Sequence, residues 1–232
     1  MIGAIKIKDG LFIGDELASQ DIEFVVANKV THIINCAGKQ IPNHWEPIGV
    51  AYLTFFWLDQ DNQVVLDSKD EASNAIFDFI EEAAQSTESV LVHSIRGQSR
   101  ATCTLAAYIM RKYRWSLLKS LEFLNSRRPD LEIRATFIHQ LSAYEQRLQQ
   151  KFNQQFTSKW EELSEEQPYL TSEELILRNT FINAQMGPLA NFKPPKGHQK
   201  VQKLMWIDQV DKSRQGKPDA LKNNDFKNDL LN

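Results

Sequence analysis

Cysteine is scarce in this chain, with only Cys36 and Cys103 among 232 residues. Each lies in a stretch that we expect to form strand or helix core, where a free thiol behaves as a small hydrophobic group. We therefore predict no structural disulfide. Both thiols should be reduced and inert, as is usual in the cytosol.

Long apolar runs and an excess of basic residues are also missing. No run approaches the ~20 apolar residues that a membrane-spanning helix needs, and the first residues lack the order of a signal peptide. The formal net charge is −3, so no basic field attracts nucleic acid. We expect a cytoplasmic protein with neither nucleic-acid nor membrane partners.

Metal-ligand spacing is absent from the histidines. His32, His44, His139 and His198 stand far apart in the sequence and form no ligand motif. We therefore expect neither a metal nor a cofactor.

Residues 1–150 alternate short β-like runs with amphipathic helical patterns. Strands are expected on both sides of the Asp9-Gly10 turn and over 31–36, 52–56 and 90–92. Helices are expected to begin after Ser19 and Ser116 as N-caps, and over 72–83, 101–113 and 137–148. The alternation predicts an α/β domain with a parallel-rich central sheet flanked by helices.

The composition changes beyond residue 150. Residues 151–232 are rich in Gln, Asn and Lys, show no long apolar period and are interrupted by prolines. We predict an extended tail that does not fold by itself. It is either a solvated tail or a segment that wraps a protein partner and orders on binding. The second interpretation rests on its separated aromatic residues, which are Phe152, Phe156, Trp160, Tyr169, Phe181, Phe192, Trp206 and Phe226.

The most informative segment is Val90–Arg100, with the sequence VLVHSIRGQSR. It reads as a strand, a loop and the start of a helix, and such a loop opens at the ligand-binding edge of an α/β sheet. Gly97 permits close backbone approach. Arg100 stands where a guanidinium group can bind two phosphoryl oxygens. Together with the helix N-terminus, these features predict a phosphate cradle.

With a cysteine at 94, the segment would read His-Cys-x-x-Gly-x-x-Arg, the signature of cysteine-dependent protein phosphatases. The chain resembles the dual-specificity phosphatase family over about residues 5–148, including segments 9–14, 30–35 and 125–130. The resemblance implies a phosphatase-like fold with Ser94 at the nucleophile position. It further implies that His93 forms hydrogen bonds that orient the loop, whereas we expect the side chain of Arg96 to be solvated. The implied phosphate-binding residues are His93, Ile95, Arg96, Gly97, Gln98, Ser99 and Arg100.

Ser94 is the first departure from the family pattern. In such a loop the pKa of a cysteine falls from ~8.5 to roughly 3.5–7.5, whereas a serine hydroxyl has no comparable acidity. No partner that could act as its base is evident. Ala101 is a second departure, since relatives have a serine or threonine there, and Thr102 could partly replace it. Cys103 lies too far along the helix to act as a displaced nucleophile.

The general acid of the family has two candidates in the segment after the strand at 52–56. Asp59 better matches the approach from the strand, and Asp61 leaves the more family-like distance to the loop. A solvated polar turn is an equally valid interpretation of both residues.

Three functional hypotheses follow. In the first, the chain is a pseudophosphatase without enzymatic activity, whose tail fastens it into a larger assembly such as the cytoskeleton or a cilium. In the second, it reads phosphopeptides. In the third, it is an active dual-specificity protein phosphatase trapped by an introduced Ser94. The loss at both Ser94 and Ala101 favours the first.

Overall fold

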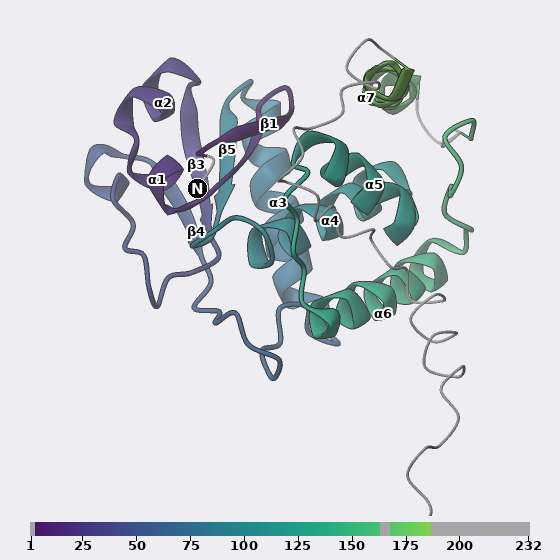
Figure 1. Cartoon of the computed structure of the whole chain (residues 1–232), viewed down its shortest axis with the longest axis horizontal. Coiled ribbons are helices and arrows are strands. Elements are labelled where there is room, and N and C mark those ends of the chain that lie inside the picture. The colour runs from purple at the N-terminus through teal and green to yellow at the C-terminus, as the bar shows by residue number, and fades with distance from the viewer. Residues whose placement is uncertain (1–2, 163–167, 187–232) are drawn as a thin grey trace, which may run out of the picture. The chain divides into compact units, whose positions relative to one another are not determined.

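The computed structural model describes residues 3–162 and 168–186, all within the unit formed by Met1–Ala190. Its centre is a five-stranded sheet in the order β1-β2-β5-β3-β4 (Figure 1). The strands are β1 (Ile5–Lys8), β2 (Leu11–Gly14), β3 (Val30–Asn35), β4 (Ala51–Thr54) and β5 (Ser89–His93). Only the β1–β2 pair is antiparallel. The predicted parallel-rich α/β fold is confirmed.

Side-chain alternation gives the sheet two buried faces. Phe12, Leu91 and Ile33 stand in register across β2, β5 and β3 and form one core cluster with Val25. The next residues along these strands point to the opposite face because side chains alternate along a strand. Apolar residues are therefore needed at consecutive positions, as expected where helices cover both faces.

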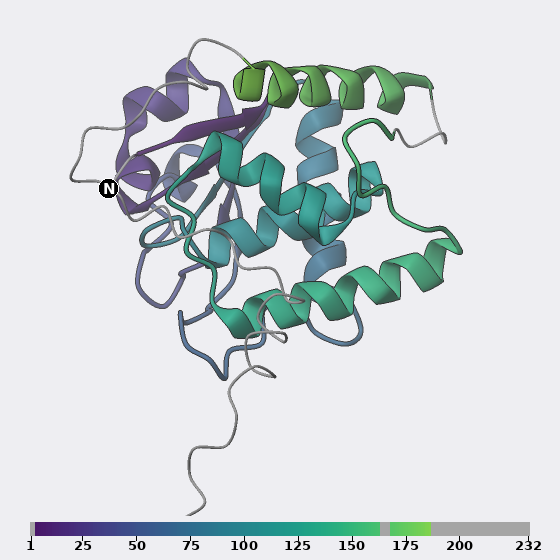
Figure 2. The same ribbon diagram turned by 45° about the vertical axis from the view of Figure 1, so that its right-hand side comes forward.

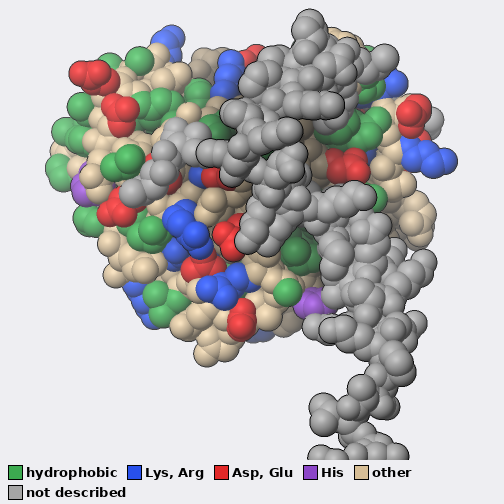
Figure 3. Space-filling model, viewed as in Figure 1, with side chains coloured by type: hydrophobic (Ala, Val, Ile, Leu, Met, Phe, Trp, Pro, Cys, Tyr) green, Lys and Arg blue, Asp and Glu red, His purple; other side chains and the backbone are tan. Residues whose placement is uncertain are grey.

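Helices cover the two faces unequally. α1 (Glu16–Gln20) and α2 (Ile22–Ala27) lie on one side of the sheet. On the other side are α3 (Glu71–Gln85), α4 (Arg100–Tyr113), α5 (Leu117–Arg127) and α6 (Ala135–Phe152). The thin side exposes apolar groups, among them Leu17 and Val26. Figure 3 shows hydrophobic side chains at the left of the view, over α1 and α2.

Helix α4 is the buried centre of the thick side. It contacts α3, α5 and α6 as well as the sheet, and every residue from Arg100 to Met110 is buried. Small residues such as Ala106 and Ala107 allow this close packing. The first residue of the helix, Arg100, is thereby fixed at the carboxyl edge of the sheet.

The helix starts agree with the sequence in one case and differ in another. Ser116 caps α5 as predicted, since its side chain accepts a hydrogen bond from the N–H of Lys119. The prediction for Ser19 was wrong. Ser19 lies inside α1, and Asp21 caps α2 by accepting from the N–H of Phe24 at 2.9 Å. Both residue types are good N-caps, but the chain turns at Asp21.

Part of the segment that we predict to be an extended tail forms regular structure. Thr157 forms a bridge with Trp115, and α7 (Pro168–Met186) is a helix of 19 residues. Its inward positions include Glu174 and Leu177, which are buried. The apolar spacing of the sequence does not reveal the buried face of α7, because Glu174 in that face carries a carboxylate.

Aromatic residues join this segment to the domain. Trp160 stacks on Phe181 with ring centroids 3.8 Å apart and meets Trp115 edge-on at 5.3 Å. Four of the aromatic anchors expected to meet a partner contact or are buried in the chain itself, namely Phe152, Phe156, Trp160 and Phe181. The predicted anchors Phe192, Trp206 and Phe226 lie outside the described residues.

The helices described here, from α1 to α7, include none that is long and apolar enough to cross a membrane.

Candidate functional site

The candidate site begins where the parallel strands end. Gly14, His93, Asn35 and Thr54 form the last register row across β2, β5, β3 and β4. Residues 94–99 leave this edge and lead into α4. The structure therefore brings the predicted loop to the edge at which α/β sheets bind ligands.

Four consecutive carbonyl groups of the loop accept hydrogen bonds from elements that surround it. For Ile95, Arg96, Gly97 and Gln98 the donors are, in order, the N–H of Glu16 (3.1 Å), Nη2 of Arg128 (2.6 Å), Oγ1 of Thr102 (3.2 Å) and the N–H of Glu132 (3.3 Å). These donors belong to α1, α4 and the chain before α6. The carbonyl groups are thus turned away from the interior of the loop.

The backbone N–H groups of the loop point inward as a consequence. In a trans peptide the N–H is opposite the C=O of the preceding residue, so the amides of Arg96, Gly97, Gln98 and Ser99 face the interior. One of these amides forms a hydrogen bond consistent with this direction, since the N–H of Gly97 donates to Ser94 Oγ at 3.1 Å. Converging amides of this kind form an anion-binding concavity.

Gly97 is required for this geometry. Its φ is +68°, and a Cβ there would lie 2.5 Å from both Gly14 O and Arg128 Nη1. Any side chain would therefore meet the backbone of β2 as well as a buried guanidinium group.

Arg128 and Asp130 support the loop from outside. Arg128 Nε binds Asp130 Oδ1 at 3.0 Å, and the Gln98 amide donates to both the carbonyl and the carboxylate of Asp130. Arg128 is only 1% exposed. The sequence alone does not predict this role. The Asn125–Asp130 segment resembles a turn of the family, but this resemblance does not indicate which residues Arg128 and Asp130 contact.

Arg100 is buried and held by two contacts. Its Nη1 donates to Trp57 O at 2.8 Å and to Gln40 Oε1 at 2.9 Å. Its Nε has no hydrogen-bond partner among the described residues. Burial lowers the pKa of Arg100, with Asp59 opposing the shift. The guanidinium group thus places a positive charge in a dry environment, where it attracts an anion more strongly than in water.

His93 does not form the hydrogen bonds that the resemblance implies. Neither ring nitrogen has a partner among the described residues, although the ring is fully buried. Burial, followed by the charges of His44 and Arg100, lowers the pKa of His93 to about 3. The imidazole is therefore neutral at pH 7. The loop is instead oriented by the outer donors to its carbonyl groups.

Ser94 and its neighbours lack the chemistry of a thiolate. The only hydrogen bond found for Ser94 Oγ within the described chain is the one accepted from Gly97. The side chain of Ala101 is buried and offers no hydroxyl. Thr102 does not replace it, because its hydroxyl donates to Gly97 O on the outer side of the loop.

The two acid candidates share one basic partner. Arg134, the residue before α6, binds Asp59 Oδ1 through Nε at 2.5 Å and Asp61 Oδ1 through Nη1 at 3.2 Å. Asp59 is the less exposed of the two side chains. Neither is hydrogen-bonded to Ser94 in the described structure. The sequence gives no sign of Arg134 because its partners lie over 70 positions earlier.

The two cysteines lie in the core. Cys36 contacts Thr104 Oγ1 at 3.3 Å, and both thiols are buried. Burial raises the pKa of Cys36 to about 12 and raises the pKa of Cys103 further. Such thiols remain protonated, so neither is placed to act as a nucleophile.

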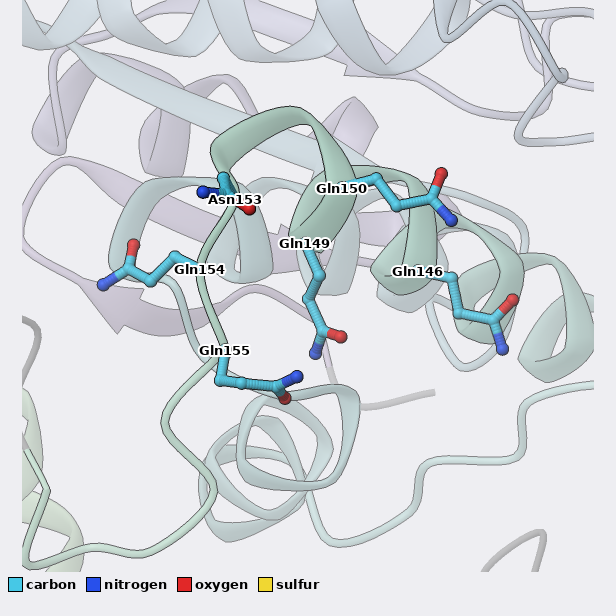
Figure 4. A pocket seen from close by; sticks show the side chains of 6 residues that line it. All are labelled: Gln146, Gln149, Gln150, Asn153, Gln154 and Gln155. Carbon is cyan, nitrogen blue, oxygen red and sulfur yellow. The ribbon is translucent and has the colours of Figure 1, made fainter.

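A separate hollow of about 400 Å³ lies at the C-terminal end of α6. It is lined only by amides, from Gln146, Gln149, Gln150, Asn153, Gln154 and Gln155. Figure 4 shows these amide groups pointing in different directions rather than at one centre. They supply neither charge nor nucleophile. Among the described residues, no group of three His, Cys, Asp or Glu side chains is placed to hold a metal ion.

Comparison with known proteins gives a family match over the region that contains this loop. The family model described as the dual specificity phosphatase catalytic domain matches residues 11–147. Dual specificity protein phosphatase 1 of Arabidopsis thaliana is 32% identical over 143 residues, which are 62% of this chain and 69% of that protein. Dual specificity protein phosphatase 1B of the same plant is 30% identical over 144 residues, which are 62% of this chain and 83% of that protein.

The fold is also similar to that of a solved structure. Human DUSP28 is 28% identical, with a TM-score of 0.54, and the match covers 64% of this chain and 97% of that chain. The loop at 94–100 lies inside the region matched by the family. The chain therefore belongs to the dual specificity phosphatase catalytic-domain family.

Proposed function

We propose that this protein is a catalytically impaired phosphatase-like protein that holds a phosphate group of a partner without cleaving it. The observation that carries the proposal is the row of four outward carbonyl groups from Ile95 to Gln98, which turns the intervening amides inward. Arg100 adds a buried positive charge at the same edge. A phosphate dianion meets the neutral hydroxyl of Ser94 there, where a thiolate would repel it.

Hydrolysis lacks two groups that it would need. A serine becomes a useful nucleophile only when a base removes its proton, and Ser94 Oγ donates to no base among the described residues. His93 precedes it but forms no hydrogen bond with it. Asp59 and Asp61 are engaged by Arg134, and neither forms a hydrogen bond with Ser94 among the described residues. Binding without turnover is the chemistry that remains.

Docking into a larger assembly is the second part of the proposal. It rests on the aromatic residues of segment 151–232, of which the early ones contact the domain itself. We therefore assign partner binding to the residues after Met186. A cytoskeletal or ciliary assembly stays a prediction from the character of that sequence.

Calorimetry with phosphopeptides tests the anion-binding part. Matched peptides would carry phosphotyrosine, phosphothreonine or no phosphate. We expect binding only with phosphate, and a loss of roughly tenfold or more in Arg100→Lys, because lysine keeps the charge but lacks the bidentate fork. Arg111→Lys, at the opposite end of the same helix, is the matched control and should bind as the unchanged protein does. Equal affinity for phosphorylated and plain peptides would refute the proposal.

Co-purification tests the docking part. The full chain would be compared with a chain that ends after Met186, which keeps the contacts of α7. We expect partners to be lost with the deleted residues. Partners retained by the shorter chain would instead place docking on the folded unit.

A further inference from the structure

A second pocket lies at the other end of the sheet from the phosphate loop. It has a volume of about 280 Å³ and lies between β1, the end of α5 and α7. Figure 2 shows α7 running past the end of β1. Its lining residues are Lys6, Ile7, Lys8, Asp9, Arg127, Glu173, Ile176, Leu177 and Thr180. Because α7 follows the region matched by the family, the pocket includes residues outside that match.

The charges around this pocket do not cancel. Lys6 pairs with Asp9 at 2.6 Å, and Lys8 pairs with Glu173 at 2.5 Å. Arg127 is the remaining cation, and no carboxylate pairs with it in the described part of the chain. One positive charge is therefore left over.

The guanidinium group of Arg127 is partly buried rather than freely solvated. It lies 5.5 Å from the ring centroid of Phe123, and desolvation lowers the pKa of Arg127. A cation that has lost some of its water without gaining a counterion gains much from an added anion. The planar fork of arginine fits a carboxylate in bidentate fashion.

Apart from Thr180, the remaining wall is apolar. Ile7 and Leu177 are buried, whereas the side chain of Ile176 is 64% exposed. An apolar chain placed along these residues would shield Ile176 from water. A dianion is disfavoured by the nearby carboxylates of Asp9 and Glu173, because only one positive charge is left uncompensated.

We propose that this pocket binds a monoanionic carboxylate that carries a short apolar chain. The carboxylate binds Arg127, and the chain lies against Ile7, Ile176 and Leu177. Two sources share this chemistry, namely a free aliphatic acid and the C-terminus of a peptide that ends in an apolar residue. The inference is independent of the phosphate loop.

The test measures methyl NMR shifts and calorimetry on the full chain. The probes are hexanoate, its neutral analogue hexanamide, and a leucine-terminated pentapeptide with a free or an amidated C-terminus. We expect shifts at Ile7, Ile176 and Leu177 with hexanoate or the free peptide. Which of these two binds more tightly identifies the source.

Variants locate the site. Arg127→Gln should weaken binding roughly tenfold or more through loss of a charge-assisted bond. Ile176→Glu, at an exposed helical position, should also weaken binding. It tests the site independently in case Arg127→Gln does not fold. Lys69→Gln removes an exposed charge from the loop just before α3 and is expected to have no effect. The proposal is overturned by absent binding, by hexanamide binding equally well, or by sensitivity to Arg100→Lys instead of Arg127→Gln.

Discussion

Gly97 shows how strictly one residue can be constrained by two neighbouring segments. A Cβ at this position meets Gly14 O and Arg128 Nη1, whereas one at Gly49 meets nothing within 4 Å although both glycines have positive φ. Substitution by alanine should therefore cause backbone strain at both glycines but a steric clash only at Gly97.

Gly97→Ala should lower the free energy of unfolding by about 2 to 4 kcal/mol, combining strain with overpacking. Gly49→Ala should cost only about 1 kcal/mol from backbone strain. Urea unfolding of both variants measures the difference. Equal losses would mean that the loop relaxes around the added methyl group, and phosphate binding would then be retained.

We predict that hydrolytic activity requires changes at both Ser94 and Ala101. Ser94→Cys alone should restore little hydrolysis of an aryl phosphate, because no hydroxyl at 101 stabilises the leaving thiolate. The double variant Ser94→Cys and Ala101→Ser should be roughly 10- to 100-fold faster than the single one. Full activity in the single variant would contradict this and would favour the hypothesis of an introduced serine.

At the scale of elements, the parts that sequence predicts best are those with local signals. The strands at Val30–Asn35 and Ser89–His93 have β-branched residues, and the capping of α5 by Ser116 follows from residue type. The loop at 94–100 is recognised from its motif. Helix α7 is not, because its buried face includes Glu174, whose partners Trp115 and Lys119 lie more than 50 positions away.

The same distinction applies within the site. Gly97 and Arg100 follow from chemistry that the local sequence displays. The contact of Arg134 with Asp59, and the contact of Arg100 with Trp57 O, depend on the tertiary fold. Backbone carbonyl partners carry no residue-type signal, so no motif could have indicated them.

The contact between α5 and α7 gives a prediction about a buried charge pair. Lys119 and Glu174 are both fully buried and 3.7 Å apart, and Trp115 Nε1 donates to the same carboxylate. Burial lowers the pKa of Lys119, opposed by Glu174. Glu174→Gln keeps an acceptor for Trp115 but removes the counterion, so it should cost about 3 to 5 kcal/mol.

The double variant Lys119→Met and Glu174→Gln is the control for that experiment. It removes both charges, and its stability should recover most of the loss. Urea unfolding monitored by tryptophan fluorescence measures all three proteins. If Glu174→Gln were as stable as the unchanged chain, the two residues would not form a desolvated pair.

At the scale of the whole molecule, His93 makes stability depend on pH. Its pKa is about 3 in the folded chain against 6.5 for the free group. As the pH falls below 6.5, the unfolded state binds a proton that the folded state does not bind until about pH 3. Stability is therefore lost between these values, by at most about 1.4 kcal/mol per pH unit from this residue.

Comparison with His93→Asn isolates that contribution. Free energies of unfolding would be measured for both proteins from pH 7 to pH 4. The variant should show a shallower slope, because its amide does not titrate. Identical slopes would mean that the buried imidazole gains a proton as readily as an exposed one.

The contacts of α7 also have a consequence for synthesis of the chain on the ribosome. Trp115 and Glu174 are 59 residues apart, so at about 5–20 residues per second the partner of Trp115 is made roughly 3 to 12 seconds later. During that interval the nascent phosphatase-like domain has an uncovered indole and a lysine without its counterion. The part of the core around Trp115 and Lys119 must therefore wait for translation of α7, and early chain release would leave a species suited to chaperone capture.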